Sequence, residues 1–204
     1  MASTTSTPLS TPHHKLFSID RRPLQPSDYF DIKDQATGGS YYMELNDDNK
    51  AIRPDLVLHT GSSVHGPVVG ICNLAIGGHM KIGLGDLEGR RPMKWEYMTR
   101  RNLRTSIFSW ETDFAWPTTD EHAEKRVLWW KRTRSVNVEG GASTFLRRNW
   151  KLVDEASDEI LAVCASSREI GHFAMLEIRV QLGDVFEQMA ILTCLSLYEE
   201  ADRD

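Results

Sequence analysis

The feature that most constrains the fold is an apolar run near the C-terminus, residues 185–198. Placed on a helix, its apolar residues cover nearly every face, and a helix that is apolar all round is buried on every side. Gly183 ends the preceding segment, and Asp184 with Glu187 three residues later is similar to a capping box. We therefore predict a buried helix over about 184–198.

The length of this helix decides between a protein core and a membrane span. Fourteen residues give about 21 Å of helix, whereas a membrane span needs about 20 residues. Glu187 and Gln188 would also lie in the hydrocarbon. The run therefore predicts the centre of a protein core, with no transmembrane segment.

Most of the preceding chain is typical of short β-strands joined by polar turns. Apolar and polar residues alternate, and β-branched and aromatic residues are frequent. The glycine-rich stretch 77–89 lacks the spacing of a phosphate-binding loop, so we interpret it as hairpin turns. The predicted strands are 29–33, 40–45, 56–60, 67–74, 93–99, 105–110, 127–133, 144–153, 160–165 and 173–181.

A sheet can bury an all-apolar helix on every side if it closes around the helix as a barrel. The order of about ten strands and one such helix resembles the tubby C-terminal-like superfamily, which includes tubby proteins, phospholipid scramblases and LURP-one-related proteins. The strand Trp150–Asp154, its acidic turn and residues 160–162 are similar to the repeated hairpin of these barrels. Residues 129–133 and 176–178, with the terminal helix, resemble small uncharacterised fungal members.

The resemblance implies a mainly β fold with one C-terminal α-helix, in which a closed antiparallel β-barrel surrounds a central hydrophobic helix. We expect this domain to span residues 16–198. Residues 1–15 are rich in Ser, Thr and Pro, which predicts a disordered tail. Residues 199–204 form a second tail, whose acidic character departs from the fungal pattern.

The cysteines and histidines show no pattern typical of an enzyme or a metal site. Cys72, Cys164 and Cys194 are far apart and form no CxxC pair, which predicts buried, reduced thiols in a cytoplasmic or nuclear protein. No HExxH motif is present, and the Gly61–His65 string is not GxSxG. We expect no enzyme activity, no metal and no cofactor.

The charge is unevenly distributed along the chain. Residues 90–150 hold 13 Lys or Arg and 7 Asp or Glu, a net +6, whereas the rest sums to −11. Trp95, Tyr97, Trp129 and Trp130 lie among the basic residues. The candidate anion-binding or headgroup-binding residues are Arg90, Arg91, Lys94, Arg100, Arg101, Arg104, Lys131, Arg132, Arg134, Arg147 and Arg148.

Three interpretations of this basic segment stay open. It forms a solvated strand face with scattered ion pairs, or it binds anionic phospholipid headgroups, or it binds nucleic acid. The net charge of −5 and the lack of a recognition motif disfavour nucleic acid. Tubby proteins bind phosphoinositides through basic barrel residues, so the resemblance implies lipid binding, although no individual residue carries over.

We therefore predict a non-enzymatic binding or adaptor module that acts at an anionic membrane surface or on a protein partner. Its location would be cytoplasmic, nuclear or peripheral to a membrane. The alternative is a small-ligand carrier or an enzyme with a pocket inside the barrel. The position of the terminal helix distinguishes the two, because a helix that fills the barrel leaves little room for an internal ligand.

Overall fold

The computed structural model describes residues 14–22, 29–46, 53–75, 77–85, 93–101, 106–112, 125–141, 149–167 and 173–203. Within these ranges the chain forms twelve strands and one helix. They are β1 (Lys15–Arg21), β2 (Tyr29–Asp34), β3 (Ser40–Leu45), β4 (Leu56–Thr60), β5 (Val68–Ala75), β6 (His79–Leu84), β7 (Lys94–Arg100), β8 (Ile107–Thr112), β9 (Arg126–Arg132), β10 (Trp150–Asp154), β11 (Ile160–Ser166), β12 (Ala174–Ile178) and α1 (Asp184–Arg203).

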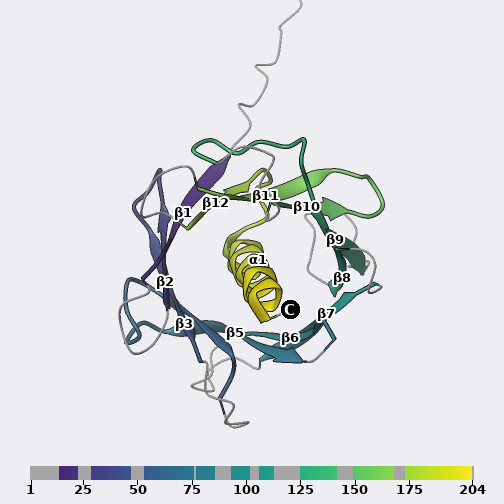
Figure 1. Cartoon of the computed structure of the whole chain (residues 1–204). Coiled ribbons are helices and arrows are strands. Elements are labelled where there is room, and N and C mark those ends of the chain that lie inside the picture. The colour runs from purple at the N-terminus through teal and green to yellow at the C-terminus, as the bar shows by residue number, and fades with distance from the viewer. Residues whose placement is uncertain are drawn as a thin grey trace, which may run out of the picture.

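The strands form a closed antiparallel barrel in which each strand pairs with the next along the chain. Pairing of β1 with β12 closes the barrel, with Phe17 opposite Leu176. Figure 1 looks along the barrel and shows α1 running through its centre. The predicted fold class, a closed antiparallel barrel around one C-terminal helix, is confirmed.

The two mouths of the barrel follow from this topology. Because all neighbouring strands are antiparallel, odd-numbered strands begin at the mouth where even-numbered strands end. α1 follows β12 and therefore begins at this mouth, which we call the near mouth. The far mouth holds the last turn of α1, where Arg21 of β1 forms an ion pair of 3.5 Å with Glu199.

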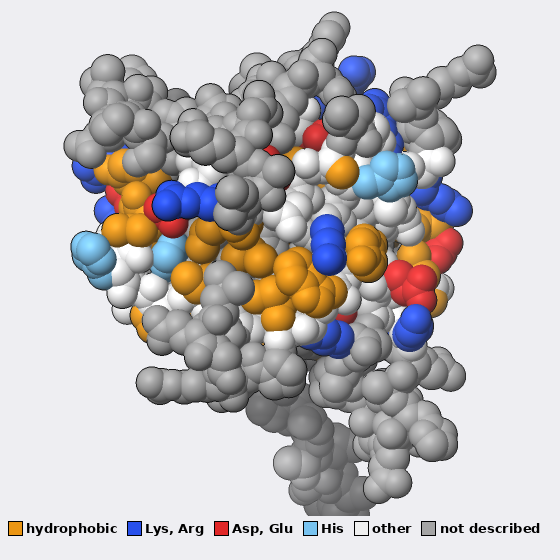
Figure 2. All heavy atoms as spheres, turned by 90° about the horizontal axis from the view of Figure 1, so that it is seen from below, with side chains coloured by type: hydrophobic (Ala, Val, Ile, Leu, Met, Phe, Trp, Pro, Cys, Tyr) orange, Lys and Arg blue, Asp and Glu red, His pale blue; other side chains and the backbone are white. Residues whose placement is uncertain are grey.

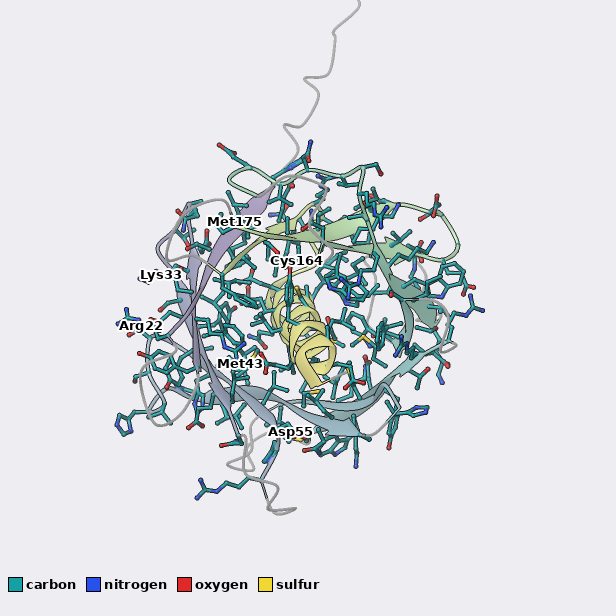
Figure 3. All side chains as sticks on the ribbon, in the orientation of Figure 1. Arg22, Lys33, Met43, Asp55, Cys164 and Met175 are labelled. Carbon is teal, nitrogen blue, oxygen red and sulfur yellow. The ribbon has the colours of Figure 1, made fainter. Side chains whose placement is uncertain are left out.

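Alternation along the strands sends every second side chain toward α1. Figure 3 shows Met43 and Cys164 inside the barrel, whereas Lys33 and Met175 lie on its outside. The inward side chains and α1 form one buried cluster, in which Leu192 of the helix is completely buried. The helix therefore occupies the interior of the barrel.

Two local features fit α1 into the barrel. A Cβ atom at Gly70 of β5 would lie 3.1 Å from Leu192 Cδ2, so glycine at this position allows the helix to approach the wall closely. The buried indole of Trp130 donates a hydrogen bond of 3.0 Å to Thr193 Oγ1. Thr193 in turn donates to the Met189 carbonyl at 2.6 Å, so the polar groups of this contact are paired.

The three cysteines are all buried and free, as predicted.

The structure differs from the sequence prediction in three elements. β1 and β6 were not predicted as strands; Phe17 and Ile19 of β1, and Met80 and Ile82 of β6, face the core. The helix continues beyond residue 198 to Arg203, and Glu200 is buried rather than part of a solvated tail. Part of the strand predicted at 144–153 lies outside the described residues, as does the start of the strand predicted at 105–110.

Candidate functional site

Six of the predicted basic residues can be placed in the structure. They are Lys94, Arg100, Arg101, Lys131, Arg132 and Arg134. The other five, Arg90, Arg91, Arg104, Arg147 and Arg148, lie outside the described residues.

The barrel distributes the described basic residues over two surfaces. Lys94 and Arg100 occupy inward positions at opposite ends of β7, in line with the buried Met98. Arg132 takes an inward position at the far mouth, where its guanidinium lies 4.3 Å from the centre of the Trp150 ring. Arg101 lies exposed at the far-mouth end of β7. Consecutive basic residues in a strand therefore do not share one face.

The outer side of β6–β9 brings aromatic and basic side chains together. Trp95 and Tyr97 of β7 are 40% and 59% exposed. Lys81 Nζ lies 4.2 Å from the centre of the Trp95 ring. We define the β6–β9 wall by Lys81, Trp95, Tyr97, Arg101, Trp129 and Lys131. Figure 2, seen from the side of β5 and β6, shows hydrophobic and basic side chains next to one another.

Two cationic side chains lie over the ring of Trp129. Arg101 Cζ lies 4.6 Å from its centre, and Lys131 Nζ lies 4.3 Å from it. Ser109 of β8 is directly opposite Trp129 and pairs on its other side with Thr99, so small side chains separate this ring from β7. Two cations, one directly after β7 and one in β9, thus lie against one indole.

Gly83 explains how Trp95 lies on the wall. The two residues are directly opposite each other in the β6–β7 pair. A Cβ atom at Gly83 would come within 2.9 Å of the Trp95 ring, so the absence of a side chain lets the indole cover the backbone of β6. Lys81 then lies over the ring.

Two of the acidic residues near the wall, Glu111 and Asp158, are strongly exposed. Glu111 accepts a bond of 3.0 Å from Lys125, and their side chains are 59% and 69% exposed. Asp158 lies 3.7 Å from Lys131 and is 83% exposed. Exposed pairs of this kind contribute little binding energy, so they compete weakly with an external anion for the basic side chains.

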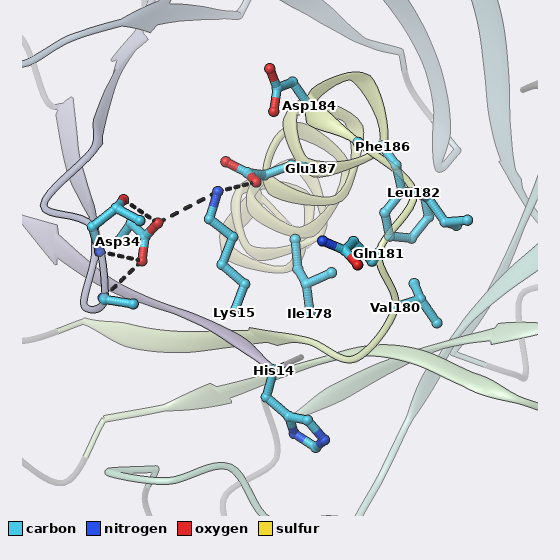
Figure 4. A pocket seen from close by; sticks show the side chains of 13 residues that line it. His14, Lys15, Asp34, Ile178, Val180, Gln181, Leu182, Asp184, Phe186 and Glu187 are labelled. Carbon is cyan, nitrogen blue, oxygen red and sulfur yellow. Dashed lines mark hydrogen bonds and ion pairs between the residues drawn. The ribbon is translucent and has the colours of Figure 1, made fainter. Parts of the chain in front are cut away.

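The near mouth contains a pocket of about 360 Å³, which Figure 4 shows. The pocket is lined by the start of β1, the turn after β2 and the segment that joins β12 to α1. The lining residues are His14, Lys15, Asp34, Ala36, Thr37, Ile178, Val180, Gln181, Leu182, Gly183, Asp184, Phe186 and Glu187.

Lys15 connects the two sides of this pocket. Its Nζ lies 2.5 Å from Glu187 Oε2 and 3.5 Å from Asp34 Oδ2, as the dashed lines of Figure 4 show. Tyr41 donates a hydrogen bond of 2.9 Å to the other oxygen of Glu187. Both oxygens of this buried carboxylate are therefore paired, and β1 and β3 are tied to the first turn of α1.

These contacts change the pKa values of the groups involved. Burial opposes the charge on Lys15, but Glu187 and Asp34 together raise the pKa of its ammonium above 10.5. Burial and the neighbouring Glu187 raise the pKa of Tyr41 well above 10.0. Burial also opposes ionisation of Asp34, but hydrogen bonds from Thr37 and Ala36, together with the positive charge of Lys15, hold its pKa below 3.8.

The sequence did not reveal this pocket, because its three segments are far apart along the chain. The only local signal was the capping pattern of Asp184 and Glu187, which predicts a helix start and no cavity. Among the residues that the structure describes, no group of His, Cys, Asp and Glu side chains is placed to hold a metal ion. No helix in the described ranges has the length and hydropathy needed to cross a membrane.

The chain was compared with protein-family models, with curated proteins and with solved structures, and none of them matches it. The resemblance to the tubby C-terminal-like superfamily therefore stays a prediction, which rests on the order of the elements and on short local patterns.

Proposed function

We propose that this protein is a binding module that associates with anionic phospholipid surfaces through the β6–β9 wall. The observation that supports this proposal best is the contact of two outward-facing indole rings with cations on one side of the barrel, where Trp95 is exposed and Trp129 is half-buried. Lys81 lies over the Trp95 ring, and Arg101 and Lys131 lie over the Trp129 ring.

The chemistry of this surface matches the boundary between lipid headgroups and water. Trp and Tyr favour this region because an apolar ring and a polar group are satisfied there together. Each Lys or Arg near an anionic surface adds about 1 kcal/mol of attraction. Tyr97 is more than half exposed, so it is free to meet the headgroups without a change in the core.

The architecture also agrees with the resemblance noted above, whose tubby members bind phosphoinositides. Under this proposal, only part of the basic segment of residues 90–150 contacts the lipid. Arg101 and Lys131 contact the lipid surface, whereas Lys94, Arg100 and Arg132 take inward positions in the barrel. The alternative of a carrier is weaker, because α1 occupies the barrel interior.

Liposome flotation tests this proposal with the full chain. Neutral vesicles, vesicles with phosphatidylserine and vesicles with a phosphoinositide are compared at low salt. We expect binding to both anionic types and little to neutral ones. In the double variant Arg101→Gln/Lys131→Gln, the affinity should fall by about 30-fold, which corresponds to about 1 kcal/mol for each charge.

Lys33→Gln is the matched control, because Lys33 is exposed on β2 at another side of the barrel (Figure 3). It removes one positive charge and should leave binding nearly unchanged. Tyr97→Ala should weaken binding without changing its dependence on salt, since it removes a ring and no charge. Absence of binding to all vesicles at low salt would refute the proposal, as would an equal loss in Lys33→Gln and in Lys131→Gln.

A further inference from the structure

We propose that the near-mouth pocket binds a small organic cation, namely a protonated amine attached to a short apolar chain. This inference goes beyond the proposed membrane association and does not depend on it. The pocket lies between β1, the turn after β2 and the start of α1, whereas the wall lies on β6–β9.

The size and lining of the pocket suit a small amphipathic molecule. Its volume of about 360 Å³ is within the range of about 300–1,000 Å³ typical of small-molecule sites. Ile178, Val180, Leu182 and Phe186 provide apolar surface. Ile178 and Phe186 are almost completely buried and belong to the core, so this side of the pocket is fixed in position.

The polar side of the pocket carries more negative than positive charge. Three carboxylates line it, those of Asp34, Asp184 and Glu187, against one ammonium, that of Lys15. Lys15 contacts both Asp34 and Glu187, so its charge is already balanced inside the protein. The carboxylate of Asp184 makes no hydrogen bond or ion pair with another described residue and stays available to a ligand.

Lys15 shows how this pocket accommodates an ammonium group. Its Nζ has carboxylate oxygens at 2.5 and 3.5 Å, and the Phe17 ring lies 5.4 Å away. The protein's own alkylammonium, that of Lys15, is therefore held by two carboxylates beside an apolar ring. Asp184, next to Leu182 and Phe186, offers the same combination to a second alkylammonium from solution.

The start of a helix generally favours anions, so an anionic ligand is the main competitor. Here Asp184 and Glu187 already occupy the first turn of α1. An added carboxylate or phosphate would meet these two charges, and it would have to compete with Asp34 and Glu187 for Lys15. The charge arrangement therefore favours the amine.

Titration of the full chain with three probes of equal chain length tests the inference. Hexylammonium, 1-hexanol and hexanoate are added separately while amide chemical shifts are followed by NMR. We expect hexylammonium to bind with shifts at residues 181–187 and hexanol to bind about tenfold more weakly, because a charge-assisted hydrogen bond is lost. Hexanoate should produce no saturable shift at these residues.

Asp184→Asn is the informative variant. The Asp184 side chain is exposed and makes no hydrogen bond with another described residue, so asparagine should preserve the fold while hexylammonium binding weakens about tenfold. Asp158→Asn is the matched control, since it removes an exposed carboxylate at a different turn. The inference is overturned if hexanoate binds as tightly as hexylammonium, if Asp184→Asn leaves amine binding unchanged, or if no probe binds at millimolar concentration.

Discussion

Asp34 and Asp154 occupy equivalent positions in two turns of the same geometry. Each is the last residue of its strand, β2 or β10, and each forms an ion pair with the first residue of the preceding paired strand. Asp34 lies 3.5 Å from Lys15 of β1, and Asp154 lies 3.1 Å from Arg126 of β9. Both pairs lie at the near mouth.

The backbone repeats the same hydrogen bonds in the two turns. Asp34 N–H donates to Gly39 at 2.8 Å, and Asp154 N–H donates to Glu159 at 3.0 Å. A hydroxyl three residues after each aspartate donates to its carboxylate, from Thr37 at 2.5 Å and from Ser157 at 2.7 Å. The fifth residue has a positive φ in both turns, 73° at Gly38 and 57° at Asp158. The units β1–β3 and β9–β11 therefore contain the same type of aspartate-stabilised turn.

The two aspartates should differ in their response to replacement by asparagine. Both oxygens of Asp34 accept hydrogen bonds, from Ala36 N–H and from Thr37. Asp154 uses only Oδ2, and its Oδ1 is buried without a partner among the described residues. An asparagine amide can replace the unused oxygen of Asp154 but not either oxygen of Asp34. We expect Asp34→Asn to cost about 2 kcal/mol and Asp154→Asn about 1 kcal/mol in urea unfolding. An equal cost would contradict this.

The contribution of Asp34 should depend on pH in the acid range. Its pKa in the folded protein lies below 3.8, because hydrogen bonds and Lys15 outweigh the effect of burial. The folded state therefore binds the proton more weakly than the unfolded state, so the stabilisation is complete above this pH and is lost as the pH falls through the lowered pKa. The difference in unfolding free energy between wild type and Asp34→Asn should be constant from pH 5 to 7 and shrink below about pH 4. A difference that persists at pH 2 would contradict the assignment.

The contact between Trp130 and α1 should be sensitive to a single oxygen atom. Thr193→Val keeps the shape of the side chain but leaves the buried indole N–H of Trp130 without its acceptor. We expect a loss of about 2 kcal/mol in thermal or urea unfolding. Ser196→Ala is the control, because Ser196 only donates to the Leu192 carbonyl of its own helix at 2.7 Å. It should cost less than about 1 kcal/mol, and a larger loss than in Thr193→Val would contradict this account.

The central position of α1 can be tested with one charge at two places on the helix. Leu192→Asp puts an unpaired carboxylate at a completely buried position beside Gly70. The cost is several kcal/mol, so we expect loss of cooperative unfolding in circular dichroism. Val185→Asp places the same charge at a position that is 46% exposed, and it should change stability by less than about 0.5 kcal/mol. A stably folded Leu192→Asp variant would mean that the helix is not central.

The fold class could be predicted from the sequence because the apolar helix leaves few ways to bury every face. β1 and β6 were missed for local reasons. Phe17 and Ile19 are the only fully buried apolar residues of β1, which directly follows a Ser/Thr/Pro-rich stretch. β6 contains Gly83, which is typical of turns but here lies beneath Trp95.

The candidate sites were harder to predict, because they depend on which strands become neighbours. Alternation within the strand predicted at 127–133 already implies that Lys131 and Arg132 face opposite sides. It does not indicate that Arg101 of one segment and Lys131 of another meet on Trp129. That contact requires the register of β7, β8 and β9, and the pocket similarly requires closure of the barrel between β1 and β12.

The hydrogen bond between Tyr41 and Glu187 should control stability at high pH. Burial and the adjacent Glu187 raise the pKa of Tyr41 well above 10.0, so the folded state holds the phenolic proton more tightly than the unfolded state. This stabilisation is complete below pH 10 and is lost as the pH rises further. At pH 8, Tyr41→Phe should cost about 2 kcal/mol, because a hydrogen bond to a charged carboxylate is lost. Lys15 also has a raised pKa, so the stability of the variant should still fall at high pH, but less steeply than that of the wild type.

Urea unfolding at a series of pH values between 8 and 11 measures both effects. Tyr97→Phe serves as the control, since Tyr97 is exposed on the outer wall. Equal slopes for wild type and Tyr41→Phe above pH 10 would show that Tyr41 does not hold this proton.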